Sequence, residues 1–244
     1  MTIREKIERD GFRKWIAKLL LIKLPLAFVA VTVLWVLMLK WVPVWVTPLM
    51  VSRSIEYRND DTFRTQKKWR RYERISPEMA KAVIASEDNL FAEHNGFDWK
   101  EMRKAIDDHK TKGKKLRGAS TISQQTAKNV LLWPGRSWLR KGLEAYFTVL
   151  IEFFWSKKRI MEVYLNSIET GEGLYGIAAV AEKNFKKSPD KLNRHECALI
   201  AATLPNPRRF SSKKPSKYII KRQTAILKEM KYIRNSELSP VPAK

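Results

Sequence analysis

An uncharged apolar run close to the N-terminus places the strongest constraint on how this chain can fold. Residues 24–39 read LPLAFVAVTVLWVLML. Extended back through residues 19–22, with the Lys23 ammonium group reaching toward the interface, the run approaches the ~20 residues that a helix needs to cross a bilayer. It is long for a cleaved signal peptide, and no small-x-small cleavage site follows it. We therefore predict an uncleaved transmembrane anchor over residues 19–42, with a buried core helix as the alternative.

The charges that precede this run predict its orientation. Basic side chains outnumber acidic ones there: Arg4, Lys6, Arg9, Arg13, Lys14, Lys18 and Lys23 stand against Glu5, Glu8 and Asp10. By the positive-inside rule, residues 1–18 should form a cytoplasmic basic segment, and the chain after the anchor should lie outside, in the periplasm or its equivalent.

The overall charge indicates an anionic partner. The formal net charge is +23 over 244 residues. Because a domain tethered outside a membrane rarely meets nucleic acid, we expect membrane lipid and lipid-linked phosphates as partners, and no nucleic acid. Cys197 is the single cysteine, so no intrachain disulfide can form, and the three histidines lack the spacing of a zinc site. Nothing that reads as a strand precedes the glycines of residues 171–176, which argues against a dinucleotide-binding loop, and no organic cofactor is expected.

Helix caps and apolar periodicity predict a mainly α-helical domain over residues 76–234. A linker and membrane-proximal edge should precede it at 43–75, and a loose tail should follow at 235–244. Ser76 and Pro77 suit the first turn of a helix that ends near Glu87. No segment shows the period-2 alternation typical of a sheet. Further helices are expected from Asp98 to about Thr111, from near Thr121, and over 137–155, 156–167, 193–204 and about 216–234.

Two neighbouring acids follow the point where the apolar stripe of the first of these helices ends. The stretch Ser86–Gly96 reads SEDNLFAEHNG, so Glu87 and Asp88 stand at a helix end that is followed by a polar turn. A carboxylate in that position can be held by packing and still face a cleft. The alternative is a pair of solvated surface acids.

Two later stretches concentrate hydrogen-bond donors. Gly118–Asn129 reads GASTISQQTAKN, and a helix that starts near Thr121 would give Gln124 and Lys128 a common face. This face offers amides and a cation but no acid, which suits an oxyanion or sugar hydroxyls. Further on, Glu144 follows Arg140 by four residues, so a simple surface ion pair is an equal alternative to a functional role.

These separated stretches resemble, in order and spacing, the bacterial peptidoglycan glycosyltransferases. That family comprises the monofunctional biosynthetic transglycosylases and the matching module of class A penicillin-binding proteins. The resemblance covers about residues 75–210. Its motifs E-D-x-x-F-x-x-H-x-G, G-x-S-T-I-S-Q-Q-x-x-K-N, R-K-x-x-E and K-x-x-I-x-E-x-Y-L-N are matched in full by residues 87–96, 118–129, 140–144 and 157–166. A glycine loop is matched by Gly171 and Gly176.

The resemblance implies a lysozyme-like helical domain with a larger head and a smaller membrane-facing jaw, after one transmembrane helix in the bacterial cytoplasmic membrane. It also implies an activity. The enzyme would transfer a growing glycan from undecaprenyl pyrophosphate to the 4-hydroxyl of the N-acetylglucosamine of lipid II, forming β-1,4 bonds with inversion. Other cell-wall synthesis or division proteins are further candidate partners. Since no transpeptidase domain follows, the monofunctional form is the closer match.

The resemblance also assigns roles to residues. Glu87 matches the general base, and Glu144 matches a second carboxylate that acts on the leaving group, either through a divalent metal (Mg²⁺ or Mn²⁺) or by holding nearby cations. Lys128 and Arg136 match positions that contact the lipid pyrophosphate. The full set of expected substrate contacts is Lys128, Arg136, Gln125, Gln124, Asn129, Ser123, Arg140 and Lys141, with supporting roles for Asp88, Phe91, His94, Gly96 and Gly118.

One departure and two alternatives accompany this interpretation. Family members commonly have an aromatic-Phe-Gly-Lys turn where this chain has Asn184-Phe185-Lys186-Lys187, so the geometry of that turn is an open question. A lysozyme-like lytic enzyme would also be helical with one catalytic glutamate, but it would cleave glycan and would not need the array of Gln125, Lys128 and Arg136. A non-enzymatic membrane protein that binds anionic lipid is the second alternative.

Overall fold

The computed structural model describes residues 11, 16, 19–113 and 120–233. The chain divides into two compact units, Met1–Val42 and Pro43–Lys244. Most of the basic segment predicted for 1–18, all of the tail predicted for 235–244, and Gly118 lie outside the described residues.

The first unit contains a helix that is long and apolar enough to cross a membrane. A turn of π-helix, η1 (Leu19–Lys23), continues into α2 (Leu24–Leu39), and the apolar part spans 20 residues from Leu20 to Leu39. The one hydroxyl inside this apolar span, that of Thr32, donates to the Phe28 carbonyl oxygen at 2.8 Å, so it needs no water. This helix fits membrane anchoring.

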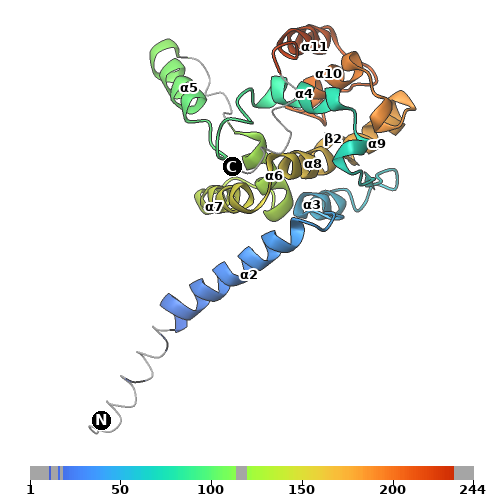
Figure 1. Cartoon of the computed structure of the whole chain (residues 1–244). Helices are drawn as coiled ribbons and strands as arrows, with labels where there is room; N and C mark the ends of the chain where they lie inside the picture. The colour runs from blue at the N-terminus through green and yellow to red at the C-terminus, as the bar shows by residue number, and fades with distance from the viewer. Residues whose placement is uncertain (1–10, 12–15, 17–18, 114–119, 234–244) are drawn as a thin grey trace. The chain divides into compact units, whose positions relative to one another are not determined.

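The second unit is mostly helical, as the sequence predicted (Figure 1). Its described helices of eight or more residues are α3 (Pro48–Glu56), α4 (Pro77–Glu87), α5 (Trp99–Lys112), α6 (Ile122–Leu131), α7 (Trp138–Phe154), α8 (Lys157–Ser167), α10 (Arg194–Thr203) and α11 (Lys217–Glu229). Its shorter helical turns are η2 (Tyr72–Arg74), α9 (Ile177–Val180), η3 (Ala181–Phe185) and η4 (Pro189–Lys191).

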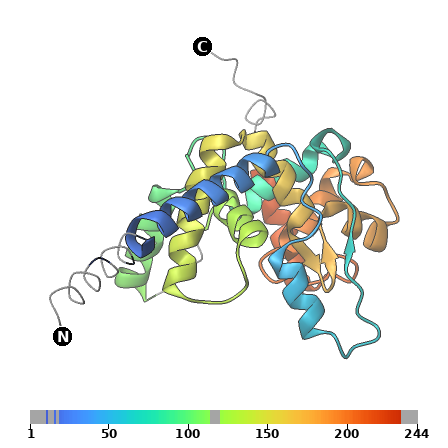
Figure 2. The same cartoon turned by 90° about the horizontal axis from the view of Figure 1, so that it is seen from below.

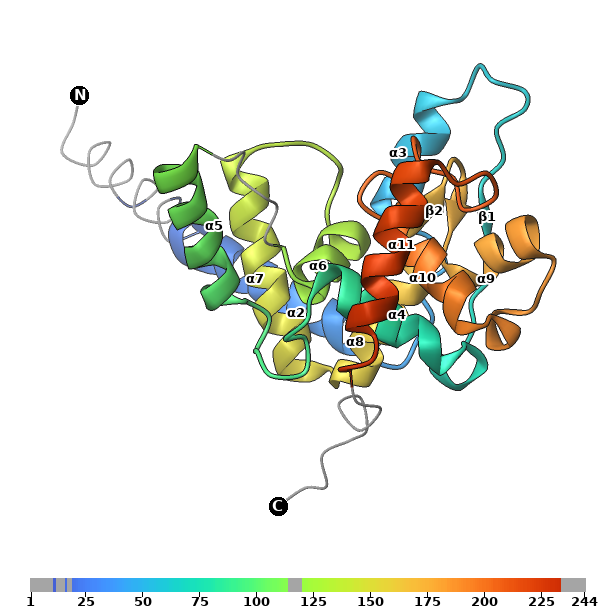
Figure 3. The ribbon, with the colours of Figure 1, turned by 90° about the horizontal axis from the view of Figure 1, so that it is seen from above.

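Two groups of helices build the core of this unit. In one group α10 packs against α11 and α4, which lie side by side in Figure 3. In the other, α6 packs against α7 and α8. The largest fully buried side chains come from both groups and from the turn between α4 and α5, and they include Tyr164, Phe91, Met79, Ile84, Ile122 and Ile151. The C-terminal end of α4 is therefore fixed by its packing in the first group, and α6 is fixed by its packing against α7 and α8.

A small sheet and helix α3 were not predicted from the sequence. Three short strands, β1 (Gln66–Lys67), β2 (Glu169–Gly171) and β3 (Leu174–Tyr175), pair in the order β1-β3-β2. β1 runs parallel to β3, and β2 runs antiparallel to it. Figure 2 shows the cyan β1 beside the gold β2 and β3. Strands of two or three residues are too short to show period-2 alternation, which explains why the pattern was missed.

Most predicted helix starts are confirmed by capping hydrogen bonds. The hydroxyls of Ser137, Ser156 and Ser216 each accept from the backbone N–H three residues on, and Thr121 and Asn193 form capping boxes. Two local predictions were wrong. Ser76 occupies the cap position of α4 without a side-chain capping bond. The last helix ends at Glu229 instead of continuing to about residue 234.

Candidate active site

Glu87 is the last residue of α4, and its carboxylate is almost enclosed, with 13% of the side chain exposed. Oε1 accepts a hydrogen bond from the Ser86 hydroxyl at 3.0 Å, and it lies 3.6 Å from Nη2 of Arg222 on α11. Oε2 accepts from Nε2 of Gln125 on α6 at 3.2 Å. Three elements that are distant in sequence therefore meet at one carboxylate.

Burial dominates the electrostatics of this group. Desolvation raises the pKa of Glu87 above its ordinary value, although the hydrogen bonds from Gln125 and Ser86 and the charge of Arg222 act in the opposite direction. The tyrosine behind it, Tyr164, donates to Oε1 of Gln125 at 3.4 Å and has its own pKa raised by complete burial. A carboxylate with a raised pKa is a better proton acceptor near neutral pH.

The turn after Glu87 is closed by side chains of the first motif. Asp88 faces Nε2 of His94, and its Oδ2 also accepts from the Ile122 backbone N–H at 2.9 Å. Phe91 is fully buried, and Lys157 Nζ lies 4.7 Å from the centre of its ring. Asp88, His94 and Phe91 therefore support the turn and are turned inward.

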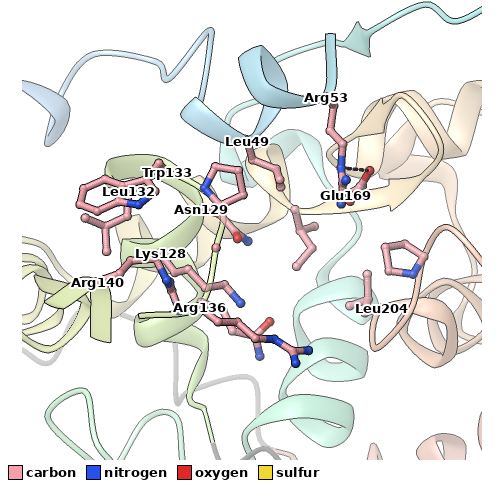
Figure 4. A pocket seen from close by; sticks show the side chains of 15 residues that line it. Leu49, Arg53, Lys128, Asn129, Leu132, Trp133, Arg136, Arg140, Glu169 and Leu204 are labelled. Atoms are coloured by element: carbon pink, nitrogen blue, oxygen red, sulfur yellow. Dashed lines mark ion pairs between the residues drawn. The ribbon is translucent and has the colours of Figure 1, made fainter. Parts of the chain in front are cut away.

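A pocket of about 370 Å³ is lined in part by Gln125, the residue whose amide donates to Glu87. Gln125, Lys128 and Asn129 line it from α6, and Arg136 and Arg140 line it from the segment that follows (Figure 4). Its other walls are largely apolar, apart from the ion pair that Arg53 makes with Glu169 at 3.7 Å. The amide of Gln125 links Glu87 to this pocket because it both lines the pocket and donates to Oε2.

The cations in the pocket differ in how they are paired. The side chains of Lys128 and Arg136 make no hydrogen bond or ion pair with any residue that the structure describes, whereas the Arg140 side chain donates to Glu144 at 3.3 Å. Burial lowers the pKa of Lys128, while the nearby charge of Glu144 raises it. Two unpaired cations on one wall suit a doubly anionic ligand such as a pyrophosphate.

Glu144 is buried on α7 and is held by two cations. Its Oε2 accepts from Arg140 and its Oε1 from Lys141. Among residues 11, 16, 19–113 and 120–233, no group of three or more His, Cys, Asp or Glu side chains could hold a metal ion. Because both oxygens of this lone carboxylate are already bonded to cations, the residues present do not form a metal site by themselves. The geometry instead supports a Glu144 that orients Arg140 and Lys141.

Two predicted contact residues face away from the pocket. Gln124 is buried, and its side chain closes the capping box of α6 with Thr121. Ser123 is also buried and donates its hydroxyl proton to Glu152 on α7. Both therefore brace the start of α6. The structure places them next to the predicted site without exposing them to it.

Comparison with known proteins identifies the family. The model of the family described as Transglycosylase matches residues 55–231. This chain belongs to the transglycosylase family. It is 58% identical over 207 residues to a biosynthetic peptidoglycan transglycosylase of Bacteroides thetaiotaomicron, which covers 84% of this chain and 83% of the relative. It is 50% identical over 220 residues to a protein of the same name from Caulobacter vibrioides, which covers 90% of this chain and 93% of the relative.

Membership of the transglycosylase family confirms the resemblance drawn from the motifs, but the sequence alone did not indicate every residue at this site. Arg222 lies 136 positions after Ser86 and reaches it only because α11 packs against α4. Tyr164 belongs to a matched motif, yet its contact with Gln125 could not be foreseen from the spacing. A lone arginine in a basic helix gives no local signal that separates it from its neighbours.

Proposed function

We propose that this chain polymerises peptidoglycan glycan strands from lipid II, with Glu87 as general base. The observation that carries the proposal is the enclosed Glu87 carboxylate, joined through Gln125 to a pocket with two unpaired cations. A base beside an anion pocket is what glycosyl transfer from a lipid pyrophosphate requires. The names of the relatives support the same reaction class.

The proposed reaction is a single displacement at the anomeric carbon of the donor. Glu87 takes the proton from the 4-hydroxyl of the acceptor N-acetylglucosamine as that oxygen attacks C1. The bond from C1 to the pyrophosphate oxygen breaks with inversion, and its electron pair leaves with the undecaprenyl pyrophosphate. Lys128 and Arg136 would stabilise the developing negative charge, and Arg140, oriented by Glu144, would add a third donor.

The test compares two glutamate variants that differ in position within one turn. Purified protein is given lipid II, and glycan strands are resolved by gel electrophoresis. We expect Glu87→Gln to lose polymerisation by roughly 100-fold or more, because proton transfer contributes 10²–10⁴-fold in enzymes. Glu93→Gln changes the same charge at an exposed position of the same turn and should retain activity. Full activity of Glu87→Gln would refute the assignment of the base.

The same samples separate the two alternative functions. Release of short fragments from preformed glycan strands, without polymer from lipid II, would indicate a lytic enzyme. Vesicle binding that falls steeply with salt and does not depend on Glu87, with neither reaction observed, would indicate an anionic-lipid-binding protein.

The membrane topology is part of the proposal. The apolar helix of residues 20–39 and the basic residues before it support a single-pass protein of the bacterial cytoplasmic membrane, with the N-terminus inside and the second unit in the periplasm. Reporter fusions after residue 244 test this. Activity of a reporter that folds only outside the cytoplasm is expected, and activity of a cytoplasmic reporter would reverse the orientation.

A further inference from the structure

We propose that Arg222 and Ser86 are positioning residues that hold Oε1 of Glu87, so that Oε2 is the oxygen that takes up the acceptor proton. This inference rests on the proposed function and deepens it. The pair is formed by the helix end that carries Glu87 and by α11, which packs against it.

Arg222 determines the direction in which the Ser86 hydroxyl donates. Arg222 Nη2 donates to Ser86 Oγ at 3.1 Å, which occupies a lone pair of that oxygen. The single hydroxyl proton can then go to Glu87 Oε1 at 3.0 Å or to the Ala201 carbonyl oxygen at 3.4 Å. The shorter contact to a carboxylate is the stronger bond. Arg222 thus directs Ser86 as a donor toward Glu87.

The two carboxylate oxygens of Glu87 receive different hydrogen bonds. Oε1 receives the Ser86 bond and the charge of Arg222 at 3.6 Å, whereas Oε2 receives one neutral amide bond of 3.2 Å from Gln125. Donors stabilise negative charge on the oxygen that they contact, so Oε2 keeps the greater basicity. Oε2 is also the oxygen bonded to a residue that lines the pocket. The geometry therefore separates a held oxygen from a reactive one.

Other titratable groups also face Glu87. Asp88 follows it in the chain, Lys128 interacts with it from α6, and Tyr164 lies behind it on α8. Among the residues with described side chains, Arg222 is the one within ion-pair distance of the Glu87 carboxylate. Loss of Arg222 should therefore disturb both the orientation of the carboxylate and the pH at which it loses its proton.

The experiment measures steady-state polymerisation of lipid II against pH for Arg222→Gln, Ser86→Ala and the double variant. We expect kcat to fall roughly 10- to 100-fold in each single variant, since small misplacements of a reacting group have effects of this size. The KM for lipid II should stay within a factor of about 2, because neither residue is proposed to touch substrate. The acidic limb for Arg222→Gln should move up by about 1 pH unit, as expected when a neighbouring opposite charge is removed.

Three comparisons make the outcome decisive. The double variant should be no slower than about the slower single variant, since both changes break one chain of contacts. Arg222→Lys should restore most of the acidic limb, while Lys221→Gln, an equal charge change at the adjacent exposed residue, should leave it unmoved. Thermal unfolding shows whether each variant is folded, and Ser86→Ala, which removes one hydroxyl, remains informative if Arg222→Gln unfolds.

Two results would overturn the proposal. One is an unmoved acidic limb in folded Arg222→Gln. The other is a rise in KM with kcat unchanged, which would make Arg222 a substrate contact. A wild-type protein that forms no polymer from lipid II would instead refute the proposed function, so the two failures are distinguishable.

Discussion

His94 donates through Nε2 to both carboxylate oxygens of Asp88, at 2.9 and 3.0 Å. The other ring nitrogen, Nδ1, accepts from the Gly96 backbone N–H at 3.1 Å. This pair of contacts determines the tautomer, because Nδ1 can accept only if the proton is on Nε2. The adjacent acids Glu87 and Asp88 therefore have different tasks: Asp88 closes the turn, and Glu87 faces the site.

Asp88→Asn should destabilise the folded protein. Asp88 accepts from His94 and from the Ile122 N–H, so an amide nitrogen at either oxygen would face a donor. An unsatisfied buried donor costs about 1–3 kcal/mol. Urea unfolding should show that loss, while Asp61→Asn, the same change at an exposed loop position, should leave stability within about 0.5 kcal/mol. Equal stability of both variants would contradict the structural role of Asp88.

Gly96→Ala should destabilise the protein by about 2–4 kcal/mol through strain and overlap together. Gly96 has a φ of +91°, and an added Cβ would lie 2.7 Å from Thr148 Cγ2 and 3.0 Å from Glu152 Cγ. The matched control is Gly142→Ala on α7, where an added Cβ meets nothing within 4 Å. That variant should gain roughly 0.5–1 kcal/mol from the better helix propensity of alanine. Calorimetric midpoints that move in the same direction for both variants would contradict this account.

The Asn184-Phe185-Lys186-Lys187 turn keeps a glycine-like backbone without a glycine. Lys186 ends η3 with a φ of 56°, in the left-handed region, and its N–H bonds the Glu182 carbonyl oxygen at 3.2 Å. Lys186→Gly should therefore stabilise the protein by about 0.5–1 kcal/mol, because it removes steric strain. Lys183→Gly, inside η3, should instead cost about 1 kcal/mol. Chemical denaturation of the two variants checks the opposite signs.

The local parts of this fold could be read from the sequence, and the contacts between distant segments could not. The helix starts at Ser137, Ser156 and Asn193 could be predicted, because a capping side chain bonds a backbone N–H only three residues away. Ser76 looked equivalent, yet its hydroxyl makes no capping bond, while its backbone N–H donates to the Pro189 carbonyl oxygen at 3.0 Å. That partner comes from tertiary structure.

The residues of the candidate site also divide into those that the sequence indicated and those whose contacts it did not show. Glu87 and Lys128 were indicated by motifs and Arg136 by the family resemblance, and the structure places Lys128 and Arg136 on the wall of the pocket that Gln125 links to Glu87. The burial that raises the pKa of Glu87 comes from the packing of several helices, which the local sequence pattern does not show. The inward turn of Ser123 toward Glu152 depends on the angle between α6 and α7, which no pattern of residue types encodes.

The raised pKa of Glu87 predicts the pH dependence of both activity and stability. Glu87 must be ionised to accept a proton, so activity should fall as the pH drops through its folded-state pKa. The acidic limb of kcat/KM for polymerisation should lie above the ordinary carboxyl value of 4.5, because desolvation is the main cause of the shift.

The free energy of unfolding should depend on pH in the opposite direction to the activity. A pKa raised in the folded state favours folding below the unfolded-state pKa, and this contribution is lost as pH rises through the folded-state value. Relative to Glu87→Gln, wild-type protein should therefore unfold at a lower temperature at pH 7.5, and the difference should move in favour of wild type toward pH 4. A gap between the two melting temperatures that does not change with pH, or an acidic limb at or below 4.5, would show that the carboxylate is solvated.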